Sequence, residues 1–130
     1  PRYNLCGSGR KIMFLTFNLD VDNLIADTDV YTVIDNTYLD SMTISQTILH
    51  SGMSTRGHSH SNQDEIYIFL AGHGLMFLTD TKNKNVTQYI VKPGVIIGVT
   101  AGYHHRVFNN SRLIDDLRFL AIFPERRLTA

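Results

Sequence analysis

The chain has 130 residues, enough for one domain with a genuine hydrophobic core and too few for two. Hydrophobic residues make up 43% of the chain and charged residues 18%, which excludes a disordered chain and a fibrous repeat. Twelve basic side chains balance twelve acidic ones, so we expect no nucleic-acid or anionic-membrane partner, whereas a small-molecule ligand remains open.

Apolar and β-branched residues occur in short runs broken by Gly, Asn, Asp or Ser, and alternation with a period of two recurs along the chain. This pattern predicts strands, because no long window carries the stripe of an amphipathic helix. Only Val21–Thr28 is expected to hold a helical turn. Strands are predicted at Lys11–Leu19, Val30–Asp35, Met42–Leu49, Ile66–Ala71, Gly74–Leu78, Val86–Val91, Val95–Val99, His105–Asn109 and Leu117–Phe123.

The connections are short. Ala71–Gly74 and Lys82–Asn85 have the length of hairpin loops, and Lys92–Gly94 is a tight turn. Consecutive strands are therefore predicted to pair antiparallel in an all-β barrel or sandwich. No repeat or linker divides the chain, so we expect a single domain, 1–130, with an N-terminal strand and loop over 1–29, the barrel over 30–124 and a polar tail over 125–130.

The predicted strand Ile66–Leu70 is apolar on both faces rather than alternating. A small barrel needs only its inside filled, so apolar residues outside it predict contact with a second copy of the chain. We therefore expect a homodimer. A strand buried between two stacked sheets is the alternative explanation of the same pattern.

One cysteine, Cys6, cannot form a disulfide within the chain, and no apolar run approaches the roughly 20 residues that span a bilayer. The sequence begins at Pro1 without the basic and apolar pattern of a secretory leader. These features predict a reducing, cytoplasmic environment.

The segment around His58 and His60 contains candidate metal ligands. Two histidines at positions i and i+2 of an extended chain point to the same face, so their imidazoles converge. Glu65, at the start of the next predicted strand, can reach back to the same point. Imidazoles and a carboxylate are ligands that iron, manganese, nickel and zinc all accept. A fourth ligand is expected from the distant pair His104 and His105.

These residues resemble the two cupin motifs. The first motif is Gly, five residues, His-x-His, four residues, Glu, six residues and Gly. The second is Gly, five residues, Pro, one residue, Gly, two residues, His, three residues and Asn, with Thr100 in the place of the usual Pro. The matching positions are Gly52, His58, His60, Glu65 and Gly72, followed by Gly94, Gly102, His105 and Asn109.

The cupin resemblance implies a small antiparallel β-barrel of the jelly-roll type with one divalent transition metal per chain. It implies His58, His60, Glu65 and His105 as the ligands, with His105 preferred over His104 because of the motif spacing.

Within the cupins, residues 30–124 are similar to the archaeal cupin-type glucose-6-phosphate isomerases. The chain is shorter than these enzymes, its loop before Thr55 is truncated, and Glu65 follows His60 by fewer residues. The similarity rests on Thr55–His60, Glu65–Tyr67, His105 and Arg106 with Asn109, and Phe119–Pro124.

The closer similarity implies a metal-dependent aldose–ketose isomerase for a small sugar or sugar phosphate. Thr55, Arg56 and Gly57 match the family's Thr-Lys-Gly and are the candidate phosphate-binding residues. Glu65 is the first candidate for the base that moves the proton, because the family places a carboxylate there. A cation lowers the basicity of its ligand, so Tyr67 and His50 remain candidate bases.

Two other functions remain open. A centre of three His and one Glu also suits an iron-dependent dioxygenase, because it leaves positions for substrate and dioxygen. The other possibility is a binding module, in which the metal pocket holds a small molecule without turnover. The fold alone cannot choose among the three, because one barrel hosts many chemistries.

Overall fold

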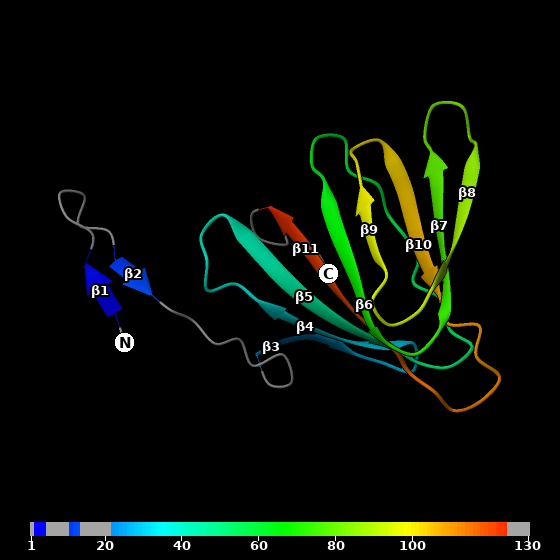
Figure 1. Cartoon of the computed structure of the whole chain (residues 1–130), viewed down its shortest axis with the longest axis horizontal. Coiled ribbons are helices and arrows are strands. Elements are labelled where there is room, and N and C mark those ends of the chain that lie inside the picture. Colours follow the sequence, from blue (N-terminus) through cyan, green and yellow to red (C-terminus); the bar gives the residue numbers. More distant parts are fainter. Residues whose placement is uncertain (1, 5–10, 14–21, 125–130) are drawn as a thin grey trace.

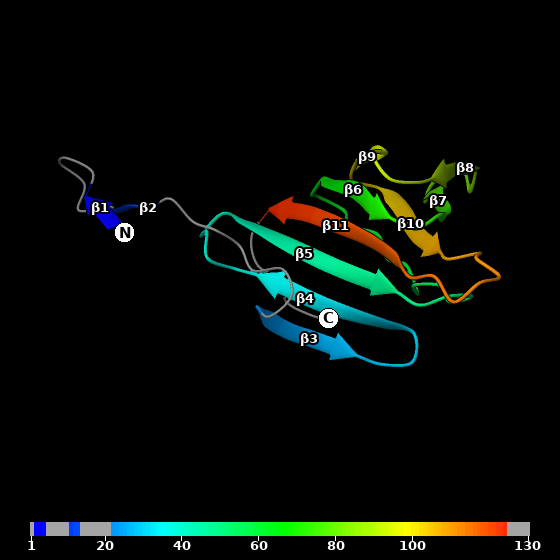
Figure 2. The same ribbon diagram turned by 60° about the horizontal axis from the view of Figure 1, so that its bottom comes forward.

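The protein is described here by a computed structural model that covers residues 2–4, 11–13 and 22–124. Nine antiparallel strands form two sheets, one of six strands and one of three (Figures 1 and 2). The prediction of an all-β jelly-roll-like barrel is confirmed. Two further short strands, β1 (Arg2–Asn4) and β2 (Lys11–Met13), pair with each other in a separate sheet.

The six-stranded sheet contains the middle and the end of the chain. Figure 2 shows β3, β4, β5, β11 and β6 side by side in one curved layer. Every neighbouring pair in this sheet is antiparallel. Its strands, in spatial order, are β3 (Asn23–Asp27), β4 (Tyr31–Asn36), β5 (Met42–Leu49), β11 (Leu117–Pro124), β6 (Glu65–Ala71) and β9 (Ile96–Val99).

The three-stranded sheet faces the inner side of the larger one. It has the spatial order β10 (Tyr103–Phe108), β7 (Gly74–Asp80) and β8 (Val86–Val91). Beyond β10, residues 52–58 run antiparallel to that strand, with isolated bridges at Ser54 to Phe108 and His58 to His105. This loop therefore extends the small sheet on the side where the histidines lie.

The core fills the space between the two sheets. Alternate residues of β11 are buried, and Leu117, Phe119, Ala121 and Phe123 all point inward. Strand β6 alternates in the same way, with Glu65, Tyr67 and Phe69 inward. The inward rows of the two sheets together form one apolar cluster at the closed part of the barrel.

The helical turn predicted at Val21–Thr28 is wrong, because Asn23–Asp27 forms the edge strand β3. Strand β3 pairs with β4, and the Thr28 hydroxyl accepts hydrogen bonds from the amides of Val30 and Tyr31 in the turn between them. Pairing with β4 satisfies more backbone groups than one isolated helical turn could. Local sequence preference is therefore overridden by the neighbouring strand.

The prediction that all consecutive strands pair is also wrong in part. Strands β3, β4 and β5 pair in order, and β7 pairs with β8, but β6 and β7 belong to different sheets. The turn between β6 and β7 is a corner rather than a hairpin. Gly72 has a φ of +82°, and a Cβ there would lie 2.4 Å from the carbonyl oxygen of Asp116, so only glycine lets the chain pass this closely.

Other sequence-based boundaries agree to within a few residues. The predicted strand Lys11–Leu19 is present as β2 over Lys11–Met13, and its remainder lies outside the described residues, as does the predicted tail over 125–130. Strand β3 extends the barrel N-terminally beyond the expected start at residue 30. Within the described part of the chain, no helix is long and apolar enough to cross a membrane.

Candidate metal centre

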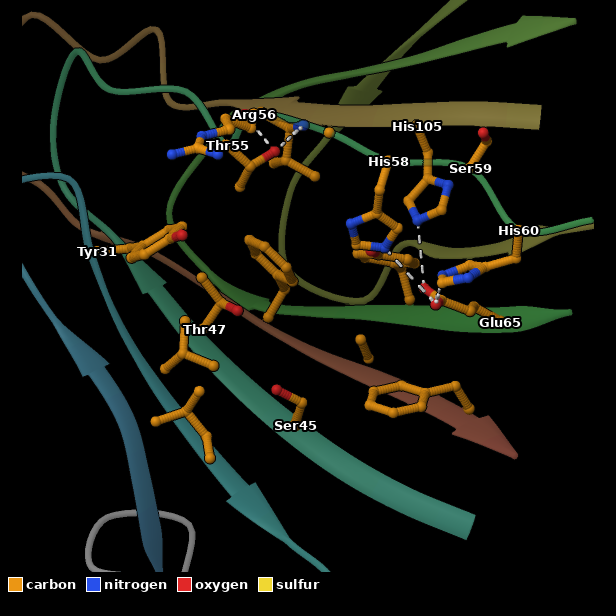
Figure 3. A pocket seen from close by; sticks show the side chains of 18 of the residues that line it. Tyr31, Ser45, Thr47, Thr55, Arg56, His58, Ser59, His60, Glu65 and His105 are labelled. Atoms are coloured by element: carbon orange, nitrogen blue, oxygen red, sulfur yellow. Dashed lines mark hydrogen bonds and ion pairs between the residues drawn. The ribbon is translucent and has the colours of Figure 1, made fainter. Parts of the chain in front are cut away.

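Three histidines and one glutamate converge at one end of the space between the sheets (Figure 3). His58 and His60 lie on the loop between β5 and β6, Glu65 is the first residue of β6, and His105 lies in β10. The four ligand atoms all lie within 4.8 Å of one another. The cluster therefore joins segments that are far apart in the sequence.

Backbone pairing brings His58 opposite His105. The amide of His58 donates to the carbonyl of His105 at 3.2 Å, and the amide of His105 donates to the carbonyl of His58 at 2.9 Å. Residues paired in this way project their side chains to the same face. Their ring centroids are consequently only 4.4 Å apart.

The loop that carries His60 and Glu65 is fixed to the turn before β10. The amide of Gly102 donates to the carbonyl of His60 at 2.8 Å. The Asp64 carboxylate accepts from the amide of Ala101 at 3.1 Å, directly before Glu65 enters the six-stranded sheet. These two bonds orient the second histidine and the carboxylate toward β10.

The carboxylate of Glu65 lies among all three imidazoles. Its Oε1 is 2.8 Å from Nε2 of His60 and 3.8 Å from Nε2 of His58. Its Oε2 is 3.3 Å from Nε2 of His105. The side chains of Glu65 and His105 are only 4% and 2% exposed, whereas those of His58 and His60 are 48% and 31% exposed, so the carboxylate is buried while two of the imidazoles still reach solvent.

The site favours an anionic Glu65. Burial raises the pKa of the Glu65 carboxyl, but the contacts and charges of the His105 and His58 imidazoles lower it by more, and the net pKa is well below its ordinary value. Burial lowers the pKa of His60 and outweighs the opposing attraction of Glu65. A carboxylate beside a neutral imidazole is the protonation state that metal binding requires.

Two buried nitrogen atoms support a metal ligand role. Nε2 of His60 and Nε2 of His105 are buried, and neither makes a hydrogen bond of good geometry with any described residue, although Glu65 is close. Nδ1 of His105 lies 3.3 Å from the carbonyl oxygen of Tyr103. A carbonyl only accepts, so this contact places the proton on Nδ1 and leaves the lone pair of Nε2 free for a ligand bond.

The spacing of these atoms fits a single ion. Ligand atoms bound to one ion at about 2.1 Å lie roughly 3–4 Å apart, close to the separations in this cluster. Three imidazoles and one carboxylate are a donor set for a divalent transition metal. The cluster of His58, His60, Glu65 and His105 can therefore hold one metal ion.

The cluster forms part of the wall of a cavity of about 610 Å³ between the two sheets. In Figure 3, Arg56, Thr55 and Tyr31 lie on the opposite side of this space from Glu65, with Thr47 and Ser45 along the strand below. The remainder of the wall includes Val33, Tyr67, Val107, Phe119, Ala121 and Phe123. The cavity therefore has an apolar floor and polar groups at both ends.

The three residues predicted to bind phosphate, Thr55, Arg56 and Gly57, all line this cavity. The Thr55 hydroxyl accepts a hydrogen bond from the amide of Val107 at 3.0 Å, so it also fastens the loop to β10. Arg56 is exposed. Among the described lining residues, it is the only lysine or arginine.

The predicted bases separate into two groups. Glu65 and Tyr67 line the cavity, and the Tyr67 ring meets the His105 ring edge-on at 5.5 Å. His50 is not among the lining residues, and its Nδ1 lies 3.1 Å from Oδ1 of Asp116. The structure thus brings Tyr67, but not His50, beside the cluster.

His104 and Arg106 project away from His105, on the other face of β10. A Cβ at Gly57 would lie 2.6 Å from Cε1 of His104, so the His104 ring packs against the loop from outside. Nη1 of Arg106 donates to the Ser54 hydroxyl at 2.7 Å, and the guanidinium lies over the Phe77 ring. Of the two neighbouring histidines, His105 is the one in the metal cluster.

Sequence reasoning missed several groups that shape the site. The Tyr103 carbonyl and the Asp64 carboxylate position ligands, and Ser45 and Thr47 supply polar groups on the cavity wall. The only sequence signal for Asp64 and Tyr103 was their nearness to the predicted ligands. Nothing in the sequence singled out Ser45 or Thr47, because their place opposite the histidines depends on the strand order.

Comparison with known proteins identifies the fold as cupin-like. No protein-family model matches the sequence, and no curated protein matches it significantly. Among solved structures, the capsular polysaccharide assembling protein CapF from Staphylococcus aureus has a TM-score of 0.72 and 18% identity over 79% of this chain. This chain covers only 30% of the length of CapF.

Two further structures cover more of this chain. KdgF from Halomonas sp. has a TM-score of 0.71 and 14% identity, over 90% of this chain and 97% of its own. Lactobacillus farciminis oxalate decarboxylase in its formate complex has a TM-score of 0.74 and 16% identity, over 91% of this chain and 35% of its own. At these identities the likeness shows the fold and leaves the reaction open.

Proposed function

We propose that the protein is a metal-dependent aldose–ketose isomerase that acts on a small sugar or sugar phosphate. The observation that carries this proposal is the position of the ligand cluster in the wall of an approximately 610 Å³ cavity rather than in a closed structural site. A cavity of this size lies in the range of small-molecule sites. The similarity of Thr55–His60 and Phe119–Pro124 to archaeal cupin-type isomerases also supports it.

Aldose–ketose isomerisation moves one proton between two neighbouring carbons and one between their oxygens, so it needs no oxidant or reductant. When bound by His58, His60, Glu65 and His105, a divalent iron, manganese, nickel or zinc ion supplies Lewis-acid polarisation of the substrate oxygens. The protein must add a group within hydrogen-bond reach of the carbon-bound proton. It must also hold the sugar in one orientation.

We assign the proton transfer to Tyr67. Glu65 has both oxygens directed at imidazoles and a lowered pKa, which makes it a better ligand than base. Tyr67 lies two residues further along β6, on the same inward face, and lines the cavity beside His105. Its hydroxyl belongs to a titratable side chain of the cavity wall that is not itself one of the four candidate ligands.

We assign the anionic end of the substrate to the loop before His58. Arg56 supplies a permanent cation with a forked set of donors that matches phosphate, and Thr55 lies beside it. The loop lies across the cavity from Glu65 (Figure 3). A sugar phosphate can therefore place its phosphate at the loop and its carbonyl end at the cluster.

The test is proton NMR of glucose 6-phosphate and fructose 6-phosphate in D₂O, with protein loaded separately with iron, manganese, nickel or zinc. Interconversion with at least one metal is expected, together with loss of activity in His58→Ala. The His73→Ala variant, changed at an exposed turn residue, is the matched control and should keep full activity. Absence of exchange with every metal would contradict the proposal.

The same preparation distinguishes the two alternatives. Oxygen consumption by the iron-loaded protein in the presence of an organic substrate indicates a dioxygenase. Retention of metal and ligand binding without turnover or oxygen consumption indicates a binding module. Both alternatives assume that the same four residues hold the metal. They differ in whether the loaded protein consumes oxygen or only binds its ligand.

A further inference from the structure

The loop between β5 and β6 contains a β-bulge where it runs along β10. Ser54 is bridged to Phe108. Four residues further along the loop, His58 is bridged to His105, which is only three residues from Phe108 on β10. The loop therefore holds one residue more than the strand segment opposite it, and Gly57, with a φ of +80°, accommodates this extra residue.

The bulge turns neighbouring residues of the loop toward the cavity. In a regular strand, Thr55 and His58 would lie on opposite faces, because they are three residues apart. Both line the cavity, and Arg56 between them does so too. The exposed Arg56 side chain makes no hydrogen bond or ion pair within the described part of the chain. Its direction is therefore set by the backbone of the bulge.

Side chains replace one of the backbone bonds that would fasten this loop to β10. The amide of Thr55 donates to the carbonyl of Val107 at 2.9 Å. The amide of Val107, however, donates to the Thr55 hydroxyl at 3.0 Å rather than to the Thr55 carbonyl. That carbonyl instead accepts a hydrogen bond from the Ser54 hydroxyl at 2.9 Å. Ser54 thus holds the peptide group that directly precedes Arg56.

Arg106 completes this network from the outer face of β10. Its Nη1 donates to the Ser54 hydroxyl at 2.7 Å, which leaves the single hydroxyl proton for the Thr55 carbonyl. A charged donor makes this hydrogen bond stronger than a neutral one. The guanidinium carbon lies 4.6 Å from the centre of the Phe77 ring on the neighbouring strand β7, and this contact orients the flat cation.

We propose that Arg106 and Ser54 are positioning residues that aim Arg56 at the anionic group of the substrate. Neither Arg106 nor Ser54 lines the cavity, so both act through the backbone of the bulge and not by touching the substrate. Without their hydrogen bonds the Thr55 carbonyl can turn, and Arg56 must then lose more conformational freedom when a ligand binds. This inference rests on the proposed function, because it takes a sugar phosphate as the ligand of Arg56.

The test is a double-mutant cycle, measured by calorimetric titration of the metal-loaded full chain with glucose 6-phosphate. Arg106→Ala and Ser54→Ala should each raise the Kd by about tenfold, with glucose binding and metal content unchanged. Ser54→Thr keeps the hydroxyl and should keep the original Kd. In an Arg56→Ala background, Arg106→Ala should change the Kd by less than about twofold, because no side chain is left to aim.

Arg112→Ala is the matched control, because Arg112 is an exposed arginine that does not line the cavity. It should leave the Kd unchanged. The positioning role would be overturned if Arg106→Ala weakened binding equally with and without Arg56, or if neither Arg106→Ala nor Ser54→Ala raised the Kd. Failure of the unaltered protein to bind glucose 6-phosphate would overturn the positioning role and the proposed substrate together.

The titration requires binding but no turnover, so it separates this inference from the proposed activity. If the expected coupling between Arg106 and Arg56 is measured, the positioning role is supported whether or not the sugar phosphates interconvert. Coupling without interconversion in the NMR assay would contradict the isomerase activity alone.

Discussion

His58 and His105 exchange two backbone hydrogen bonds, and this pairing sets their imidazoles side by side at the edge of the three-stranded sheet. The ligand pair is therefore part of the sheet rather than the product of two mobile side chains. A site held by backbone pairing keeps its geometry before a ligand arrives. Several measurable consequences depend on this arrangement.

Removal of either paired histidine should abolish metal binding. In His58→Ala and His105→Ala, one of the four candidate ligands is lost, so most of the bound metal should disappear. Metal analysis after purification without chelator measures this. His104→Ala, changed at the neighbouring residue that points away from the cluster, should keep about one metal per chain, and unchanged occupancy in both ligand variants would remove the site assignment.

Gly57→Ala should destabilise the protein more than Gly52→Ala. Both glycines have positive φ, but a Cβ at Gly57 would lie 2.6 Å from the His104 ring and 2.7 Å from the carbonyl oxygen of His105, whereas Gly52 has nothing within 4 Å. The crowding should lower the free energy of unfolding by about 2 kcal/mol more than strain alone does. Urea unfolding of the two variants measures the difference, and equal losses would contradict the close packing.

The stability of the metal-free protein should fall as the pH drops below about 6.5. The pKa of His60 is lowered from 6.5 in the folded protein, mainly by burial, so the unfolded chain binds this proton more readily. The free energy of unfolding therefore rises with pH between the lowered pKa and 6.5, and it loses this contribution on acidification. The lowered pKa of Glu65 has the same sign but acts only below about 4.5.

His60→Gln should accordingly show a smaller change of unfolding free energy between about pH 5 and pH 7 than the unaltered protein. His73→Gln, at the exposed turn between β6 and β7, is the control and should leave the slope unchanged. Denaturant titrations in the presence of chelator measure both. An identical slope in His60→Gln would show that burial of this imidazole does not couple to folding.

Tyr67→Phe should separate catalysis from metal binding. The substitution keeps the ring that packs against His105 and Phe119, at centroid distances of 5.5 and 5.6 Å, and removes only the hydroxyl. We expect kcat for sugar isomerisation to fall by about a hundredfold, as for loss of a proton-transfer group, while metal content and Tm stay unchanged. A variant with full kcat would exclude Tyr67 as that group.

Arg56→Ala should weaken binding of a phosphorylated substrate and leave binding of the free sugar unchanged. Loss of hydrogen bonds to a charged group should raise the KM for glucose 6-phosphate by about tenfold to a hundredfold. Arg56→Lys keeps the charge without the fork and should give an intermediate KM. Steady-state kinetics with the free sugar provide the control, since an equal rise in KM for glucose would contradict a phosphate role.

Much of the barrel could be predicted from local pattern. Met42–Leu49 and Val86–Val91 form strands with the predicted bounds, because alternation and turn residues are visible within each segment. A helical turn was predicted within Val21–Thr28, where the structure has the strand Asn23–Asp27, because the strand character of this segment comes from pairing with β4. The Gly72 turn was expected to be a hairpin because its length does not reveal that β6 and β7 enter different sheets.

The sequence by itself determined which residues can coordinate a metal, because ligand chemistry and the His-x-His spacing are local properties of the chain. Only the tertiary structure decided that His105 rather than His104 faces Glu65, that His50 lies away from the cavity, and that Ser45 and Thr47 form its opposite wall. The reason is that a strand sends neighbouring residues to opposite faces, so their roles depend on the register in which distant strands pair.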